Sequence, residues 1–214
     1  MLLKGKNASL KTYFRLINER FENIKTVYIN CQHYRTEYTI ISKIYKEINN
    51  KNPDLSGLST MDIYNKVIDY LLLENKVLII AFDDYGLLKN VKELNKTFYS
   101  LCRTHETFKN VQVSLITISS LEKNIALDPL VSTIYLPIEI KFPFYRREEI
   151  FHIRKQRCYL GFYPNVISED TIEKIAKNTF WKVNLRYGIK TLLELGEKAE
   201  LNYESKIKFN LLFY

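Results

Sequence analysis

Hydrophobic residues recur along the chain with two alternating periods, one typical of helices and one typical of buried strands. Apolar positions at helical spacing predict helices over residues 8–21, 38–48, 63–72 and 87–102. Ser59 and Asp62 form a capping-box pattern that predicts the start of the third of these helices. Short apolar or β-branched runs predict strands over residues 26–31, 77–82, 111–118 and 137–142. Strands that alternate with helices in this way favour an α/β fold, in which helices flank both faces of a parallel sheet.

The pattern changes after Pro143, where helical spacing continues without strands. It predicts three further helices with short connections, over residues 147–160, 168–178 and 184–203. The last nine residues have the pattern of a strand or of a frayed helix. We therefore expect three parts: a core over residues 1–143, a small all-helical domain over 144–205 and a tail over 206–214.

Composition and charge narrow the class of protein. Of the 214 residues, 46% are hydrophobic and 26% are charged, which is typical of a globular protein and too apolar for a disordered one. The 32 Lys and Arg against 24 Asp and Glu give a net charge of +8, which favours an anionic partner. Three widely spaced cysteines argue against a disulfide framework or a zinc site. No apolar run is long enough to span a membrane, so we expect a cytoplasmic protein with no membrane partner.

Two acids follow directly after the apolar run over residues 77–82, namely Asp83 and Asp84. Ligands of open α/β sheets bind beyond the carboxyl ends of the strands, where a carboxylate can hold Mg²⁺ beside a nucleotide phosphate. Four aliphatic residues followed by two acids have the pattern of the Walker B motif of ATPases, with Asp84 at the position that is usually Glu. The alternative interpretation is a buried strand that ends in an acidic turn.

A short glycine–lysine motif precedes the first predicted helix. In a phosphate-binding loop, G-x-x-x-x-G-K-[ST], backbone N–H groups and the Lys side chain bind phosphate at a helix N-terminus. Gly5 and Lys6 match the end of this motif, whereas Asn7 replaces the hydroxyl residue and the first glycine would fall before Met1. The alternative is a solvated Gly-Lys pair at the start of the chain.

Two further polar positions fit a nucleotide site. Ser120 follows the strand that ends at residue 118, where an ATPase orients the attacking water, and a simple serine turn is the alternative. Arg186 begins the last predicted helix, from which an arginine could reach nucleotide phosphates. The alternative for Arg186 is an arginine on the surface of a helix.

Several short segments occur together in an order that is typical of one family. The chain resembles the AAA+ ATPases, and among them the archaeal replication initiators, which are related to origin recognition complex subunit one and cell division control protein six. The resemblance covers roughly residues 5–200. Besides the acid pair, it rests on the segments 26–31, 36–38, 57–60, 63–64, 127–131, 142–145, 162–164 and 184–186.

The resemblance implies a P-loop NTPase-like AAA+ core that lacks its usual first strand, together with a helical lid. It implies ATP or ADP with Mg²⁺ as cofactors, DNA as a partner, and contacts with other AAA+ subunits. Carried over residue by residue, it assigns nucleotide binding to Gly5, Lys6, Asn7, Ser120 at the sensor-one position and Arg186 as the sensor-two arginine, Mg²⁺ to Asp83, and catalysis to Asp84.

Departures from the family pattern point to weak catalysis. No arginine occurs between Arg103 and Arg146, where the family supplies an arginine finger that is worth about 10³–10⁵ in rate. Asp84 is one methylene shorter than Glu, and misplacement of a catalytic group by about 1 Å can cost about 100-fold in rate. The missing first strand and glycines indicate a chain truncated at its N-terminus. The vacant strand position would be filled by the tail, by closure of the sheet or by a partner chain.

We therefore expect a replication-initiator-like AAA+ module that acts as a DNA- or partner-binding regulator with weak or absent ATP hydrolysis. One alternative is an ATP-binding switch, and another is a structural interaction protein that binds no nucleotide. Trp181 is expected in the core of the helical domain. A basic cluster at the start of that domain either binds phosphate or is the solvated face of a helix; it comprises Arg146, Arg147, Arg154, Lys155 and Arg157.

Overall fold

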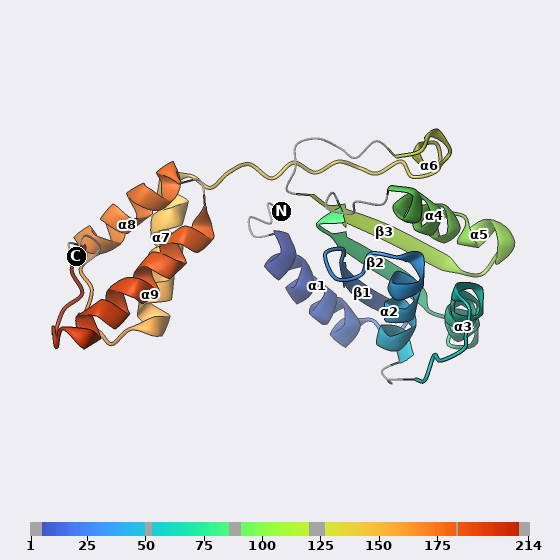
Figure 1. Cartoon of the computed structure of the whole chain (residues 1–214), viewed down its shortest axis with the longest axis horizontal. Coiled ribbons are helices and arrows are strands. Elements are labelled where there is room, and N and C mark those ends of the chain that lie inside the picture. Colours follow the sequence, from blue (N-terminus) through green and yellow to red (C-terminus); the bar gives the residue numbers. More distant parts are fainter. Residues whose placement is uncertain (1–5, 50–52, 86–90, 120–126, 183, 210–214) are drawn as a thin grey trace. The chain divides into compact units, whose positions relative to one another are not determined.

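The computed structural model describes residues 6–49, 53–85, 91–119, 127–182 and 184–209 (Figure 1). The chain forms two compact units, residues 1–140 and residues 141–214. The first unit combines a sheet with helices, and the second is built from helices. Within the described residues no helix is long and apolar enough to cross a membrane.

The first unit contains a parallel sheet with the strand order β1-β2-β3 in the described part of the chain. The strands are β1 (Ile24–Asn30), β2 (Val77–Asp83) and β3 (Gln112–Ile118). The pairing is in register throughout, so that Asn30 lies beside Asp83 and Asp83 beside Ile118. The three strands therefore end level with one another, and the residues that follow them start at one edge of the sheet.

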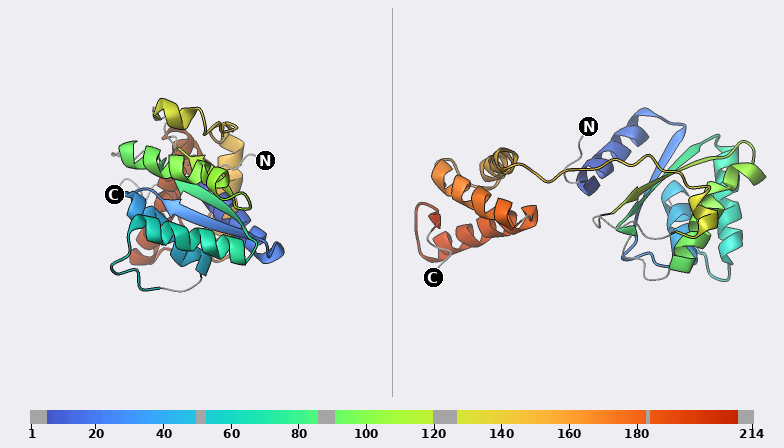
Figure 2. Two further views of the ribbon diagram at one scale, coloured as in Figure 1. Left: turned by 90° about the vertical axis from the view of Figure 1, so that its right-hand side faces the viewer. Right: turned by 90° about the horizontal axis from the view of Figure 1, so that it is seen from above.

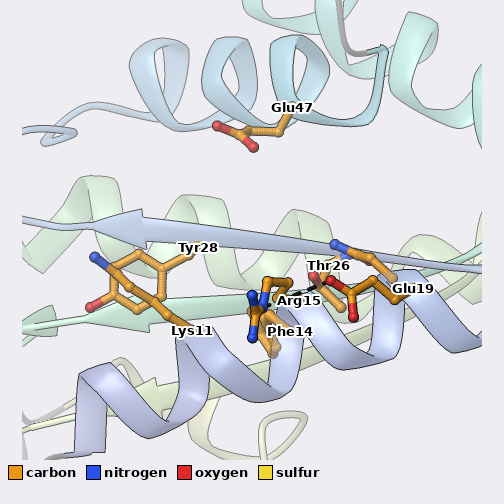
Figure 3. Close-up of a pocket in the computed structure, with 8 residues that line it drawn as sticks. Lys11, Phe14, Arg15, Glu19, Thr26, Tyr28 and Glu47 are labelled. Atoms are coloured by element: carbon orange, nitrogen blue, oxygen red, sulfur yellow. Dashed lines mark hydrogen bonds and ion pairs between the residues drawn. The ribbon is translucent and has the colours of Figure 1, made fainter.

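Helices cover both faces of this sheet, as Figure 2 shows. The helix α1 (Lys6–Arg20) lies against one face at β1, and Figure 3 shows α1 and α2 on opposite sides of that strand. The other face is covered by α2 (Glu37–Asn49), α3 (Thr60–Leu73) and α4 (Val91–Cys102), while the short α5 (Thr104–Thr107) and α6 (Pro129–Ser132) pack at the β3 side. The prediction of a parallel sheet between helices is confirmed.

The core of this unit lies between the sheet and the helices α2, α3 and α4. Side chains of a strand alternate between faces, so Val27, Ile29, Ile80 and Phe82 point into this core and are fully buried or nearly so. The ring of Phe82 packs against that of Phe98 from α4 with 4.9 Å between ring centroids. Residues on the α1 face, such as Tyr28 and Ile79, are only half-buried. The sheet is therefore anchored mainly by one of its two faces.

The second unit is a bundle of α7 (Arg147–Gly161), α8 (Glu169–Trp181) and α9 (Leu185–Leu201). Ser168 and Asn184 cap the last two helices through side-chain oxygens that accept backbone N–H groups. Apolar side chains from all three helices form a separate core. Ile207 is buried in this core and forms an isolated parallel bridge with Ile167.

Most predicted elements are confirmed, including the capping box in which Ser59 and Asp62 each accept a bond from the other's backbone N–H. The strand predicted over residues 137–142 is wrong, because residues 135–146 belong to no helix or strand. Apolar alternation allows a strand to form, but a strand needs a partner, and Pro137 and Pro143 also lack backbone donors. The tail over 206–209 packs in the helical unit, so this described part does not fill a place in the sheet.

The anchoring of the sheet by one face can be tested by truncating its central strand. The Ile80→Ala variant should lose about 2–5 kcal/mol of unfolding free energy, because it leaves a cavity among fully buried side chains. Leu73→Ala, at an exposed position of α3, is the matched control and should change stability by less than about 0.5 kcal/mol. Urea unfolding followed by circular dichroism measures both. Equal effects of the two variants would contradict this picture of the core.

Candidate functional site

The acid pair lies where β2 ends, level with the end of β1. Asp83 is 2% exposed, and its Oδ2 accepts a hydrogen bond from the Tyr28 hydroxyl. The backbone carbonyl of Asp83 accepts the N–H of Cys31 at 2.9 Å, which continues the pairing of the two strands by one residue. The carboxylate predicted to hold Mg²⁺ is thus buried and already bonded to a neighbouring strand.

Asp84 leaves the strand with a left-handed backbone, at φ 54°. This conformation costs about 1–2 kcal/mol for most residues and is tolerated best by Gly, Asn and Asp. Its Oδ2 accepts a bond of 3.0 Å from Gln32 Nε2. The carbonyl of Gln32 in turn accepts Arg35 Nε at 2.7 Å, and the Gln32 N–H donates to Asn30 Oδ1 at 2.8 Å. Asp84 is therefore held by a turn that is itself fixed by hydrogen bonds.

The charges of the two carboxylates contribute to raised pKa values of the neighbouring Cys31 and Tyr28 side chains. Burial raises the pKa of the Cys31 thiol to about 12, and the negative charges of Asp83 and Asp84 add to the effect. Burial, the hydrogen bond to Asp83 and the same two charges also raise the pKa of Tyr28. Tyr28 and Cys31 therefore hold their protons more tightly than exposed side chains of the same type.

A divalent cation would meet few protein ligands here. In the described residues no group of three or more His, Cys, Asp or Glu side chains is placed to hold a metal ion. Mg²⁺ is commonly bound through one or two carboxylates, with water and substrate phosphates as the other ligands. The pair of Asp83 and Asp84 fits that mode in number and donor type, although the Tyr28 hydroxyl already occupies one oxygen of Asp83.

The other residues that the sequence assigns to nucleotide binding lie outside the described residues, at the start of α1 or in the second unit. Gly5 and Ser120 lie outside the described residues. Lys6 and Asn7 begin α1, but the structure describes only their backbone and not their side chains. Arg186 is exposed in the first turn of α9, where its N–H donates to Asn184 Oδ1 at 3.0 Å. Since α9 belongs to the second unit, a phosphate contact by Arg186 stays a prediction.

An open hollow of about 530 Å³ lies beside β1, between α1 and α2 (Figure 3). Lys11 and Arg15 line it together with Glu19 and Glu47, so that charges of both signs offset one another. Lys11 Nζ lies 4.3 Å from the centroid of the Tyr28 ring. Neither acid of the pair lines this hollow, and it lacks the single sign of charge that suits a nucleotide phosphate.

Arg154 is fully buried among α7, α8 and α9, which corrects its assignment to a surface cluster. Its Nη2 donates to the carbonyl of Leu185 at 2.6 Å and lies 3.5 Å from Thr179 Oγ1. Nε and Nη1 have no hydrogen-bond partner in the described residues, and burial lowers the pKa of Arg154 to about 10. A Cβ at Gly188 would lie 2.2 Å from Nη2, so only glycine leaves room for the guanidinium. Arg154 thereby fixes the first turn of α9, which carries Arg186.

Trp181 is 72% exposed at the end of α8, so its predicted place in the core is wrong. The Nζ of Lys182 lies 5.6 Å from the ring centroid of Tyr187, and Arg186 is exposed beside it in the sequence. We name these residues, Trp181, Lys182, Arg186 and Tyr187, the α8–α9 corner. Aromatic faces next to basic side chains are what nucleic-acid-binding surfaces present.

The basic cluster predicted at the start of the helical unit is largely neutralised. Arg147 pairs with Glu173 at 2.6 Å, and Lys155 pairs with Glu169. With Arg154 buried as well, the solvated helix face is the better of the two interpretations given above. At the α8–α9 corner, Lys182 and Arg186 are exposed beside aromatic side chains, which the cluster in the sequence did not indicate.

Comparison with solved structures places the fold in a known class. The Aeropyrum pernix ORC2 protein, solved as ADPNP–ADP complexes, matches with a TM-score of 0.77 and 22% identity, over 97% of this chain and 57% of that chain. The Aeropyrum pernix ORC1 protein, solved in complex with DNA, matches with a TM-score of 0.73 and 22% identity, over 98% and 55% of the two chains. No family model matches the sequence. The parallel sheet with its acid pair and the helical unit define an AAA+ fold.

Sequence relatives identify the family. An ORC1-type DNA replication protein 2 of Methanothermobacter thermautotrophicus is 38% identical over 197 residues, which are 92% of this chain and 52% of the relative. Its namesake from Methanosarcina mazei is 32% identical over 96% of this chain and 55% of the relative. The chain thus belongs to the archaeal ORC1-type replication-initiator family of AAA+ proteins, and it spans about half the length of these curated relatives.

The close approach at Gly188 generates a stability prediction. Gly188→Ala should destabilise the helical unit by about 1–3 kcal/mol, because the added methyl overlaps Arg154 and Thr179. Gly161→Ala is the matched control, since a Cβ there meets nothing within 4 Å, and it should be neutral or stabilising. Thermal unfolding of the two variants measures the difference. Equal melting temperatures would show that the guanidinium does not occupy this space.

The raised pKa of Cys31 generates a pH prediction. With a pKa of about 12, only about one thiol in 10⁴ is ionised at pH 8, against roughly a quarter of free cysteines. Alkylation of Cys31 by iodoacetamide should therefore be slower than that of an unfolded control by at least about 10³-fold, and should accelerate as the pH rises. Mass spectrometry of peptides after timed labelling reads this out. Fast labelling of Cys31 in the folded protein at pH 8 would contradict the burial described.

Proposed function

We propose that this chain is a replication-initiator-like module that binds DNA or a protein partner and hydrolyses ATP weakly or not at all. The observation that carries the proposal is the state of the acid pair. Asp83 is buried and bonded to Tyr28, and Asp84 is bonded to Gln32 in a left-handed turn. Carboxylate oxygens that already accept hydrogen bonds are less able to orient a water molecule for ATP hydrolysis.

Weak hydrolysis follows from the position that a general base must take. A general base must come within hydrogen-bond reach of the water that it activates, about 2.6–3.2 Å or through one water. Asp84 has a shorter side chain than the usual Glu, and the Gln32 amide directs one of its oxygens toward the β1 turn. The sequence also has no arginine between Arg103 and Arg146 to act as a finger.

The chain's own groups would still bind a nucleotide in the proposed state. Mg²⁺, when bound, would neutralise phosphate charge, and Asp83 and Asp84 would hold it. Lys6 and Arg186 would each offset phosphate charge through their own positive charges. The Asp84→Glu variant would have a longer carboxylate side chain but would still lack an arginine finger. We therefore expect ATP hydrolysis to stay slow in that variant.

DNA binding is supported by the family and by the charge of the helical unit. The relatives are named DNA replication proteins, and the Aeropyrum ORC1 structure contains DNA. Residues 141–214 hold 14 Lys and Arg against 9 Asp and Glu, a net charge of +5 out of the total of +8. Phosphate neutralisation by such a surface releases counterions and makes affinity fall with salt. We place the contact at the α8–α9 corner.

Fluorescence anisotropy with duplex DNA tests this proposal on the full chain. Affinity should fall linearly on a log–log plot against salt, and Arg186→Gln or Lys182→Gln should each lower the magnitude of that slope by about 1. Lys155→Gln is the matched control, because Lys155 is ion-paired with Glu169, and it should change the slope little. An affinity without salt dependence, or equal effects of all three variants, would overturn the assignment to the corner.

An ATP-binding switch is the second candidate. It is favoured by Arg186, which is exposed in the first turn of a 17-residue helix and is set there by the Asn184 cap and by Arg154. In this case ATP with Mg²⁺ should raise the melting temperature, because a ligand that binds only the folded state stabilises it. Asp83→Asn should reduce that shift. Absence of any shift with millimolar ATP or ADP would eliminate the switch and leave the DNA or protein partner.

A further inference from the structure

The helical unit leaves one large aromatic side chain, Trp181, in water. It is the last residue of α8 and is 72% exposed, although tryptophan is on average a highly buried residue. The neighbouring Phe180 is 40% exposed, and the two rings lie at 73° to each other with 6.0 Å between their centroids. Such an edge-to-face contact cannot cover both faces of the indole. Most of the indole surface is therefore open to a ligand.

The chain around Trp181 carries positive charge without a balancing acid. Residues 174–193 contain five Lys or Arg and no Asp or Glu. Two of the five, Lys174 and Lys190, form ion pairs with acids one turn away on their own helices. The other three are exposed and form no ion pair within the described residues, namely Lys177, Lys182 and Arg186. An anion at this surface would meet cations that no acid neutralises.

These cations flank the indole on both sides along the chain. Lys177 precedes Trp181 by four residues, which places both on the same face of α8. Lys182 follows it directly, and its Nζ lies 5.6 Å from the ring centroid of Tyr187. Arg186 is in the first turn of α9, where its N–H donates to the Asn184 side chain. Tyr187 is only half-buried and attracts the Lys182 ammonium without neutralising its charge.

We propose that the α8–α9 corner binds single-stranded DNA, with an unpaired base stacked on the Trp181 ring and the flanking phosphates held by Lys177, Lys182 and Arg186. This inference rests on the proposed function, because it names the form of DNA that the same surface takes. Exposed aromatic rings combined with basic side chains are what surfaces that bind single strands have in common. Since every base has a flat π-face, such binding tolerates any sequence.

Stacking distinguishes a single strand from a duplex. The faces of a base in a duplex are covered by its neighbours, so that base has to be unstacked before it can reach an indole. An unpaired base has already lost its pairing partner and reaches the ring at lower cost. A duplex would consequently meet the cations of the corner but not the ring. We therefore expect the chain to bind a single strand more tightly than a duplex of the same length.

The emission of Trp181 provides a direct test, because it is the only tryptophan of the chain. An oligothymidylate of about 15 nucleotides should quench this emission in the full chain, since a stacked base contacts the indole. An abasic sugar–phosphate chain of the same length carries the same charge without bases. It should bind more weakly and leave the emission largely unchanged, and so should a duplex of that length.

Variants measured by fluorescence anisotropy separate stacking from charge. Trp181→Ala should raise Kd for the labelled oligothymidylate by at least about fivefold, and Trp181→Phe should recover part of that loss. Neither variant should change Kd for the abasic chain or the duplex. Tyr163→Ala is the matched control, because Tyr163 is 86% exposed near the opposite end of α8. Thermal unfolding should show that all three variants fold like the wild type, since each changes an exposed side chain.

The outcomes separate this inference from the proposed function. Equal quenching by the abasic chain, an unchanged Kd in Trp181→Ala, or an equal loss in Tyr163→Ala would overturn the stacking. If a duplex then still binds with the expected dependence on salt, the proposed function stands with a duplex as its ligand. If neither form of DNA binds, both the stacking and DNA binding at the corner are overturned.

Discussion

The in-register parallel pairing of β1, β2 and β3 is the constraint on which the α/β unit depends. Each strand ends level with its neighbour, so the turns after Asn30 and Asp83 begin side by side. The central strand is buried by the helices on its main face, and this burial stabilises the sheet. Asp83 lies on the opposite, α1 face of the sheet and is buried there as well. Burial and the charges of the acid pair together keep the protons of Tyr28 and Cys31 in place.

Sequence patterns predicted well those elements whose stabilising contacts require a recognisable set of residue types. Ser59 and Asp62 begin α3 through bonds within one turn, and the run over 77–82 is apolar on both faces because it is the central strand. The pattern over 137–142 failed as a strand prediction, since alternation encodes the capacity to pair and says nothing about a partner. Arg154 and Trp181 were misplaced for a related reason: helical spacing does not reveal which side chains the meeting helices enclose.

Half of the candidate site could be read from the sequence. Asp83 and Asp84 lie together at the predicted edge, whereas Tyr28 and Gln32, which hold them, were not singled out. Tyr28 alternates with Val27 and Ile29, and the register places it on the face of Asp83, so strand pairing was the signal that could have found it. Contacts made across turns, such as that of Gln32, depend on backbone paths that spacing alone does not describe.

The buried guanidinium of Arg154 has a consequence for how the helical unit opens. Two of its nitrogens lack partners in the described structure, so the group regains hydration as soon as water reaches it. Detachment of α9 would expose the guanidinium and remove its bond to Leu185, leaving α7 and α8 around a newly hydrated charge. A partly opened bundle therefore keeps little of the original packing advantage. The three helices are expected to separate in a single cooperative transition, without a long-lived form in which one of them has frayed away.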